Sequence, residues 1–405
     1  NPYRYCNTKR NKTDIYSAEN RQIARDVAAE TFVLLKNEGN LLPLKKQGKI
    51  ALIGPLADTR NNIAGTWSVA QAPEKYTTIK EAMEKALDGK ATLLYAQGSN
   101  IWRNHELQKN GEQGKSIAWG DEVKMKNEAL QIAKEADVIV CAMGETADMS
   151  GECASRTNLE MPDVQQELLA ELTKTGKPIV LLNFAGRPTV LSWENEHIPA
   201  IMNVWFGGSE VGDALCDVIF GDKVPSGKLT TSMPKTTGQE PLYYNHQNTG
   251  RPVPDDNQKF AKFASNCLDV SNGPLYPFGY GLSYTTFEYG DLKLSSHEVN
   301  MDDWKITATI NVKNTGSRDA DEVVQLYIRD MVASISRPVK ELKGFQRIHL
   351  AAGESREICF DITPEMLKFY NAELKHVIEP GDFQIMVGGN SKEVKTQNLT
   401  VKKHP

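Results

Sequence analysis

The chain has 405 residues, of which 40% are hydrophobic and 24% are charged, and its formal net charge is −5. A chain of this length exceeds what one core normally serves, so we expect two or three domains. The negative charge and the lack of a dense Lys/Arg block argue against a nucleic-acid partner, and no apolar run approaches the roughly 20 residues that a membrane helix needs.

The N-terminal part predicts a helix, a strand and a polar loop. The chain opens with NPYRYC, without an initiator Met or a signal peptide, so we expect it to be cut from something longer. Residues 17–35 carry apolar side chains at helical spacing, with Ser17 as N-cap. Residues 49–54 predict a buried strand, and the polar loop at 61–71 holds an isolated Trp67.

Alternating strand and helix patterns continue to about Met233. Further strands are expected at 91–96, 178–182 and 200–204, and helices at 78–87, 123–136 and about 209–220, with a polar insertion at 97–120. The strands are almost continuously apolar, which is typical of strands buried on both faces. The alternation therefore predicts an α/β domain with a largely parallel sheet flanked by helices.

Residues 138–161, VIVCAMGETADMSGECASRTNLEM, are the centre of this domain. They begin as a buried strand and continue as a polar loop that carries Glu145, Asp148, Glu152 and Arg156. Helical spacing resumes directly after the loop. Open α/β sheets bind their ligands at such loops, beyond the carboxyl ends of the strands. This loop is therefore the candidate site.

The sequence disfavours two classes of site. The six cysteines are scattered and form no C-x-x-C, which argues against a zinc site or a disulfide framework. The strand-to-glycine turns IALIGP and VIVCAMGE are of the kind found in dinucleotide-binding folds. Neither is followed by G-x-G-x-x-G, so we reject a dinucleotide-dependent enzyme and expect no cofactor.

The C-terminal part changes its pattern twice. Residues 234–283 are rich in Pro, Gly, Asn, Tyr and Asp without a sustained period, which indicates a long connector. From Thr286 onward apolar residues alternate with polar ones in about seven short strands, for example at Ile306, Ala308 and Ile310. This period of two predicts an immunoglobulin-like or fibronectin type III-like β-sandwich, so the fold class is α/β followed by all-β.

Several motifs resemble those of glycoside hydrolase family 3, the β-glucosidases, and they occur in that family's order. They are LLKNEGNLLPL, KIALIGPLAD, SGECASR followed by MP, GKPIVLL, WFGGSEVGDALCDVIFGDKVPSGKL and LYPFGYGLSYTTF. The resemblance extends from about Ser17 to the C-terminus, and NPYRYC resembles the exit from the family's N-terminal (β/α)8 barrel, which is otherwise missing. It implies four parts: a residual barrel exit and linker helix at 1–40, an α/β sandwich domain at 41–233, a connector at 234–285 and a fibronectin type III-like domain at 286–405.

The resemblance also implies a division of the chemistry between domains. In the family the barrel carries the Asp nucleophile, and the following α/β domain lends the general acid/base Glu, which corresponds to Glu152 in SGECASR. A retaining glycosidase needs two carboxyl groups about 5–5.5 Å apart, so we expect the chain to be inactive alone. Glu145 and Asp148 remain alternatives because they share the loop.

Two further residues are candidate substrate contacts. Trp67 lies in AGTWS, which resembles the family's loop whose Trp stacks on a sugar at the leaving-group subsite. A structural Trp that fills its own loop is the alternative. Arg156 could contact Glu152 or sugar hydroxyls, or it could simply anchor the loop.

The predicted function is part of a retaining exo-acting β-glucosidase that hydrolyses terminal non-reducing β-D-glucosyl residues. Its expected partners are an oligosaccharide or glycoside substrate and the missing barrel. By resemblance we expect a periplasmic or secreted protein, and a homodimer is compatible with the sequence. The alternative is a non-catalytic carbohydrate-binding or adhesion module, which Glu152 in its motif argues against.

Overall fold

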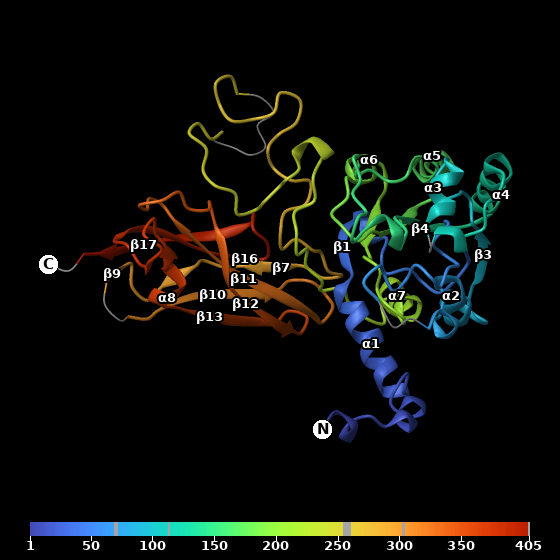
Figure 1. Cartoon of the computed structure of the whole chain (residues 1–405), viewed down its shortest axis with the longest axis horizontal. Coiled ribbons are helices and arrows are strands. Elements are labelled where there is room, and N and C mark those ends of the chain that lie inside the picture. The colour runs from blue at the N-terminus through green and yellow to red at the C-terminus, as the bar shows by residue number, and fades with distance from the viewer. Residues whose placement is uncertain (69–71, 112–113, 254–260, 302–303, 404–405) are drawn as a thin grey trace. The chain divides into compact units, whose positions relative to one another are not determined.

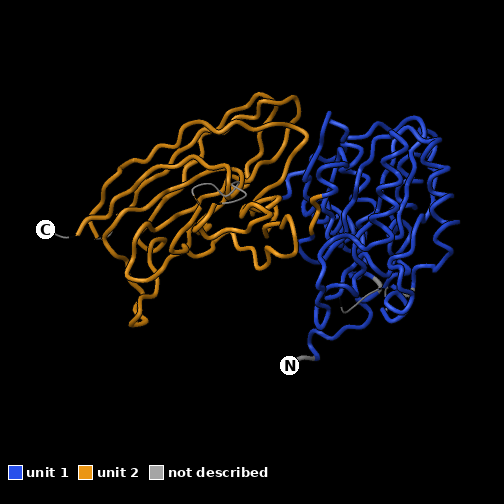
Figure 2. Tube along the Cα trace, turned by 90° about the horizontal axis from the view of Figure 1, so that it is seen from above, with its two compact units in different colours: residues 1–189, 193–227 blue, residues 190–192, 228–405 orange. Residues whose placement is uncertain are grey.

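Two compact units make up the chain, and the computed structural model describes residues 1–68, 72–111, 114–253, 261–301 and 304–403 (Figure 1). The first unit comprises residues 1–189 and 193–227, and the second comprises residues 190–192 and 228–405 (Figure 2). Each unit has its own sheet or sheets and its own buried core, so the two are described separately.

A six-stranded sheet forms the centre of the first unit. Its strands run in the order β1-β6-β5-β4-β2-β3, and every neighbouring pair is parallel except β1 with β6. The bounds are β1 (Val33–Asn37), β2 (Lys49–Ile53), β3 (Thr92–Ala96), β4 (Val138–Gly144), β5 (Ile179–Phe184) and β6 (Ala200–Asn203). All residues of β5 and β6 are buried, as expected for strands covered on both faces. The predicted parallel sheet is confirmed.

Helices cover this sheet on both sides (Figure 1). Helices α1 and α2 pack against α7, whereas α4 packs against α5. The bounds are α1 (Ala18–Thr31), α2 (Ile79–Leu87), α3 (His105–Asn110), α4 (Glu122–Glu135), α5 (Asp163–Thr173), α6 (Ser192–His197) and α7 (Val211–Ile219). The alternation of strand and helix thus produces the layered α/β arrangement that the sequence predicts.

The helix predicted for residues 17–35 is shorter than its apolar spacing suggests. Ser17 caps it as expected, but α1 ends at Thr31, and the residues after Phe32 form strand β1, antiparallel to β6. The side chains from Phe32 to Leu35 are 0–1% exposed, so burial at the sheet edge outweighs their helical spacing. Ile23 and Val27, which the spacing would bury, are each 54% exposed.

Charged contacts, rather than an apolar stripe, attach α1 to the rest of the unit. Arg21 donates two hydrogen bonds of 3.0 Å to the carboxylate of Glu210, and Arg25 makes a similar two-pronged contact with Asp217. Both carboxylates are largely buried; Glu210 is the N-cap of α7, and Asp217 lies within that helix. Such bidentate pairs fix orientation as well as contributing energy. They explain how a helix with exposed Ile and Val side chains is held in place.

The second unit is a β-sandwich. One sheet has the order β13-β10-β7, with β8 also paired to β10, and the other has the order β12-β11-β16-β17-β9. The long strands are β10 (Ile306–Asn314), β11 (Ala320–Asp330), β12 (Glu341–Leu350), β13 (Ser355–Ile362), β16 (Gly381–Gly388) and β17 (Val394–Lys402). The shorter elements are β7 (Phe287–Tyr289), β8 (Lys293–Leu294), β9 (Glu298–Asn300), α8 (Pro364–Leu367), β14 (Phe369–Tyr370) and β15 (His376–Val377).

Alternation along the strands builds the core of this sandwich. In β10 the side chains of Ile306, Ala308, Ile310 and Val312 are at most 2% exposed, and the residues between them are more exposed. They pack with inward residues of the other sheet, such as Leu326, in one cluster. The predicted β-sandwich is confirmed.

Glycine ends the central strand β4 because no other residue fits there. Gly144 has a φ of +127°, and a Cβ at this position would collide with the carbonyl oxygen of Phe184. Gly176 also has a positive φ, +70°, but a Cβ there would meet no atom within 4 Å. A side chain at Gly176 would therefore cause backbone strain alone, whereas one at Gly144 would cause both backbone strain and a steric collision.

We expect Gly144→Ala to lower the free energy of unfolding by on the order of 3 kcal/mol or more, and Gly176→Ala by about 1 kcal/mol. The larger loss reflects displacement of β5, which pairs with β4 at this residue. Urea titration followed by circular dichroism measures both. Equal losses for the two variants would contradict the collision.

Candidate active site

The loops of the first unit gather beyond the carboxyl ends of its parallel strands. The loop after β2 carries Trp67, the polar insertion follows β3, and the loop with Glu152 follows β4. Arg187 comes three residues after the end of β5. Because parallel strands end at one edge of a sheet, these segments are neighbours in space.

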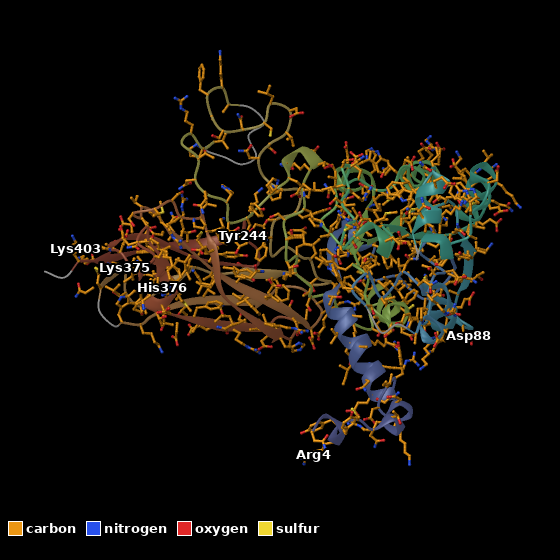
Figure 3. All side chains as sticks on the ribbon, in the orientation of Figure 1. Arg4, Asp88, Tyr244, Lys375, His376 and Lys403 are labelled. Atoms are coloured by element: carbon orange, nitrogen blue, oxygen red, sulfur yellow. The ribbon has the colours of Figure 1, made fainter. Side chains whose placement is uncertain are left out.

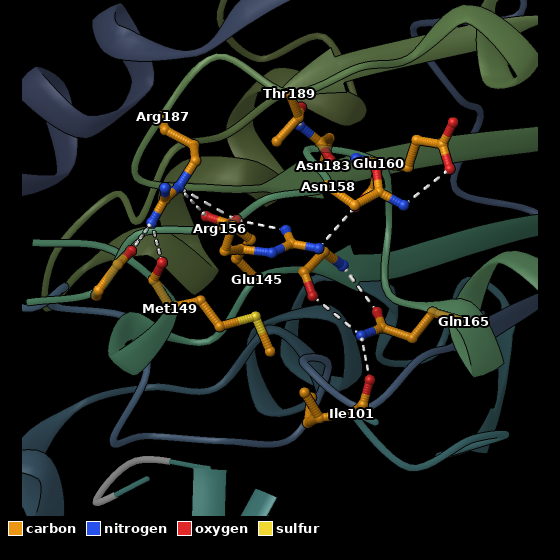
Figure 4. Close-up of polar contacts among 12 residues, drawn as sticks. Ile101, Glu145, Met149, Arg156, Asn158, Glu160, Gln165, Asn183, Arg187 and Thr189 are labelled. Carbon is orange, nitrogen blue, oxygen red and sulfur yellow. Dashed lines mark hydrogen bonds and ion pairs between the residues drawn. The ribbon is translucent and has the colours of Figure 1, made fainter. Parts of the chain in front are cut away.

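A buried carboxylate fixes the base of the Glu152 loop (Figure 4). The side chain of Glu145 is 1% exposed, and Arg156 Nη1 lies 2.6 Å from its Oε1. Arg187 Nε lies 3.3 Å from the same carboxylate. The backbone N–H of Glu145 donates to the carbonyl oxygen of Phe184 at 2.7 Å. Two guanidinium groups thus replace the water that this charge loses on burial.

The two arginines also hold the backbone of the loop. Arg187 Nη2 donates to the carbonyl oxygens of Met149 and Ala154, the second at 2.6 Å. Arg156 Nη2 donates to the carbonyl oxygen of Glu160 at 2.9 Å. The residues on both sides of Glu152 are therefore attached to one buried charge cluster, which we call the Glu145 clamp: Glu145, Arg156 and Arg187.

Glu152 itself stands at the exposed turn of this clamped loop. It lies between Gly151, with a φ of +98°, and Cys153, with a φ of +58°. Its side chain is exposed and makes no hydrogen bond or ion pair with any other residue that the structure describes. The loop thus presents the carboxylate to the outside while its flanks stay fixed.

The loop of Trp67 is fastened to the same turn. The hydroxyl of Thr66 donates to the carbonyl oxygens of Ala147 and Ser150, the second at 2.7 Å. A Cβ on Gly151 would lie 2.8 Å from Thr66 Cγ2, so the two loops are in close contact. Trp67 follows directly and is 72% exposed. The structure therefore brings the loops of Trp67 and Glu152 together.

The other acidic residues of the loop are already engaged in the fold. Asp148 accepts the backbone N–H of Gly114 at 2.7 Å and so joins the polar insertion to the loop. Glu145 is committed to its two arginines. Arg156 is largely buried, and its guanidinium carbon lies 5.2 Å from the centre of the Trp102 ring. Glu152 is the candidate carboxylate that remains exposed.

The sequence analysis missed two charged residues that the fold largely buries. Arg187 carries no motif of its own, although its place after β5 assigns it to the same edge as the loop. Glu194, in the six-residue helix α6, is 2% exposed, and no described residue bonds to its Oε1. Burial raises the pKa of Glu194 from the ordinary 4.5 to about 7, and the charge of Glu160 adds to this effect.

Two further kinds of site were searched for among the described residues. No three His, Cys, Asp or Glu side chains converge so that they could hold a metal ion. In the same part of the chain, no helix combines the length and the apolar character needed to cross a membrane.

Comparisons with known proteins place this chain among the glycoside hydrolases. Residues 32–284 match the Glycosyl hydrolase family 3 C-terminal domain, and residues 322–391 match the Fibronectin type III-like domain. The first match covers well over half of the chain. The chain belongs to glycoside hydrolase family 3, as its motifs indicated.

Relatives with assigned names support the same family. The chain is 44% identical to a periplasmic beta-glucosidase of Salmonella typhimurium over 97% of its own length and 52% of the relative. It is 37% identical to a beta-xylosidase of Formosa agariphila, over 95% of the chain and 50% of the relative. The crystal structure of a beta-glucosidase from Listeria innocua in complex with isofagomine matches with a TM-score of 0.88 and 35% identity, over 100% of this chain and 53% of that one. The chain therefore spans about half the length of these relatives.

The buried Glu194 predicts a pH-dependent stability. Between pH 4.5 and about 7 the folded chain binds this proton more tightly than the unfolded chain, so stability falls as the pH rises through that window. Glu194→Gln removes the free-energy cost of ionising this buried carboxyl group. Relative to the parent chain, we expect the variant to gain on the order of 2 to 3 kcal/mol between pH 4.5 and pH 8.

Urea unfolding at several pH values measures this difference. Glu196→Gln is the matched control, because Glu196 is exposed on the same helix, and it should change the free energy of unfolding little. A pH-independent difference between the parent chain and Glu194→Gln would show that Glu194 does not titrate in this range.

Proposed function

We propose that the chain is part of a retaining exo-acting β-glucosidase that hydrolyses terminal non-reducing β-D-glucosyl residues, with Glu152 as its general acid/base. The carrying observation is the exposure of Glu152 on a loop whose flanks are fixed by the Glu145 clamp. Similarity to proteins named beta-glucosidase supports the substrate class. The nucleophilic Asp belongs, in this proposal, to a (β/α)8 barrel outside the chain.

The chemistry explains why an exposed carboxylate suits this role. In a retaining enzyme one carboxyl attacks the anomeric carbon, while the other protonates the leaving oxygen and later deprotonates the attacking water. The two groups must stand about 5–5.5 Å apart. A carboxylate at the turn of a projecting loop can meet a nucleophile on another domain, whereas a buried one such as Glu145 cannot approach a sugar.

Trp67 and Arg156 receive different roles. An exposed indole beside the Glu152 turn offers a flat apolar face to the C–H face of a pyranose, so we assign Trp67 to the leaving-group subsite. Both terminal nitrogens of Arg156 bond within the protein, to Glu145 and to the backbone of Glu160. Of its two roles, anchoring the loop is the one that these contacts favour.

The proposal extends to the domain bounds, the substrate class and the location of the protein. We propose the domain division 1–40, 41–233, 234–285 and 286–405, and a glycoside or oligosaccharide as substrate. A periplasmic or secreted location is proposed from the similarity to the periplasmic beta-glucosidase.

In the enzyme that includes the barrel, we expect Glu152→Gln to lose orders of magnitude on cellobiose and much less in glycosylation by dinitrophenyl glucosides. A poor leaving group needs the proton of Glu152, whereas dinitrophenolate departs without it. Azide should restore turnover, because it attacks the glycosyl-enzyme without a general base. Steady-state kinetics with and without azide measure all three effects, and the chain alone should hydrolyse neither substrate.

Glu145→Gln and Asp148→Asn are the matched comparisons. Because Glu152 has no partner among the described residues, Glu152→Gln should leave the melting temperature unchanged, whereas Glu145→Gln should lower it by breaking a buried ion pair. A Glu152→Gln enzyme with unchanged rates on cellobiose would move the acid/base role to Glu145 or Asp148. Hydrolysis by the chain alone would refute the division between domains.

Trp67→Ala should weaken disaccharide turnover more than turnover of small aryl glucosides. Loss of one stacking contact costs on the order of 1 kcal/mol, so the effect on kcat/KM should be several-fold. Trp119→Ala, which removes another exposed indole of the same unit, serves as the control. Equal losses on both substrates, or a large fall in melting temperature, would instead identify Trp67 as a structural residue.

A further inference from the structure

A second candidate site lies in the other unit of the chain. A cavity of about 510 Å³ opens between the connector and the β-sandwich, and every described residue that lines it belongs to residues 232–277, 339–340 or 391–392. None of these belongs to the unit that carries Glu152 and Trp67. Its volume is in the range of pockets that bind small ligands.

Hydrogen bonds between connector and sandwich hold the walls of this cavity in place. The backbone N–H of Val339 donates to the carbonyl oxygen of His246 at 2.9 Å, and that of Leu342 donates to the hydroxyl of Tyr244 at 3.2 Å. The backbone N–H of Ser391 donates to the carbonyl oxygen of Phe278 at 2.9 Å. These contacts fix the walls of the cavity at His246, Val339 and Ser391.

Stacked aromatic rings support one wall. The ring of Tyr244, labelled in Figure 3, stacks on Phe278 with centres 4.1 Å apart and an angle of 15° between the planes. The ring of Tyr327 meets that of Tyr244 edge-on, with centres 6.1 Å apart. The neighbouring Tyr243 also lines the cavity but is 63% exposed. The ring of Tyr244 is therefore held by its neighbours, whereas the ring of Tyr243 is exposed and available for stacking.

The polar groups of the lining are mostly neutral. Among the described residues that line the cavity there is no Asp, Glu or Arg, whereas amides and hydroxyls such as Asn248, Asn272, Thr249 and Ser265 are frequent. Asn272 donates its amide N–H to the carbonyl oxygen of Ser265 at 2.8 Å, which fixes its orientation. The two lysines, at 340 and 392, already have partners within the chain.

This combination fits one ligand chemistry. Sugar rings present apolar C–H faces and a rim of neutral hydroxyls, which match an exposed aromatic ring beside amide and hydroxyl groups. An anionic ligand would call for arginines, and a cationic one for carboxylates. We infer that this cavity, with Tyr243 as its stacking ring and Asn272 as a hydrogen-bonding group, binds a short neutral oligosaccharide at a site separate from Glu152.

The exposed cysteines provide a test that needs no variant. Cys267 lines the cavity, Cys153 adjoins Glu152, and Cys6 and Cys359 are exposed elsewhere. We expect cellotriose to slow the alkylation of Cys267 by iodoacetamide several-fold, with no change at Cys6 or Cys359, as mapped by peptide mass spectrometry. Protection of Cys153 alone would place all binding at the Glu152 loop and overturn the inference.

A pair of tyrosine variants tests the same site by affinity. In a Trp67→Ala background, which removes the other stacking ring, Tyr243→Ala should raise the Kd for cellotriose about five-fold or more in isothermal titration calorimetry. Tyr370→Ala is the matched control, because Tyr370 is 64% exposed in the same unit and does not line the cavity. Tyr370→Ala should leave the Kd for cellotriose the same as in the Trp67→Ala background.

Several outcomes would overturn the assignment. No cellotriose binding in the Trp67→Ala background, or equal losses for Tyr243→Ala and Tyr370→Ala, would remove the second site. Protection of Cys267 by a proline-rich peptide but not by cellotriose would identify a peptide groove instead. None of these results depends on the role of Glu152, so the proposed catalytic function stands or falls separately.

Discussion

The ion pairs of Glu145 are the interaction on which the carboxyl edge of the first unit depends. A carboxylate that is 1% exposed must be neutralised, and Arg156 and Arg187 do so from two different segments of the chain. Each arginine then uses its remaining N–H groups on loop carbonyls. One buried charge therefore orders a loop that has no regular secondary structure beyond a single short turn at Ala147–Met149. Removing either arginine would leave that buried charge with a single cationic partner and would free the loop carbonyls that the arginine holds.

A second buried polar group extends this order to the neighbouring strand. The side chain of Gln165, in α5, is fully buried and bonds to both the N–H and the carbonyl oxygen of Gly144. It also donates to the carbonyl oxygen of Ile101, at the start of the polar insertion. Because Gly144 adjoins Glu145, the strand end, the insertion and the loop form one connected polar network. The insertion is braced again where Asp148 accepts from Gly114.

Local patterns predicted most of the architecture. The buried strands β4 and β5 and the alternating strand β10 follow directly from their periods, because each is decided by which faces are buried. The position of the candidate loop also follows, from the rule that ligand sites lie at the carboxyl ends of parallel strands. Strand β1 could not be predicted from a local period. It forms because it pairs with β6, which lies about 170 positions further along the chain.

The sequence predicted where the candidate site lies, but it predicted the roles of the individual acidic residues only in part. Spacing alone does not separate Glu145, Asp148 and Glu152, which are acidic residues of one polar loop, and only the family motif SGECASR singles out Glu152. The distinction between them comes from Arg187, which is 42 residues from Glu145, and from the backbone N–H of Gly114. Contacts of this range cannot be read from spacing, so burial of one carboxylate and exposure of another become visible only in the fold.

In the proposed assignment, the structural and the chemical roles belong to different residues of one short segment. A carboxylate that stabilises a fold needs to be buried and charged, so that its arginines stay paired. A general acid must instead exchange a proton and stand within reach of a bound substrate. One residue cannot meet both demands. Under the proposed assignment the two demands fall on residues seven positions apart: Glu145 carries the buried charge, and Glu152, at the turn, bonds to no described residue. The fixed loop can therefore place a carboxylate against another domain without that carboxylate being needed to hold the loop together.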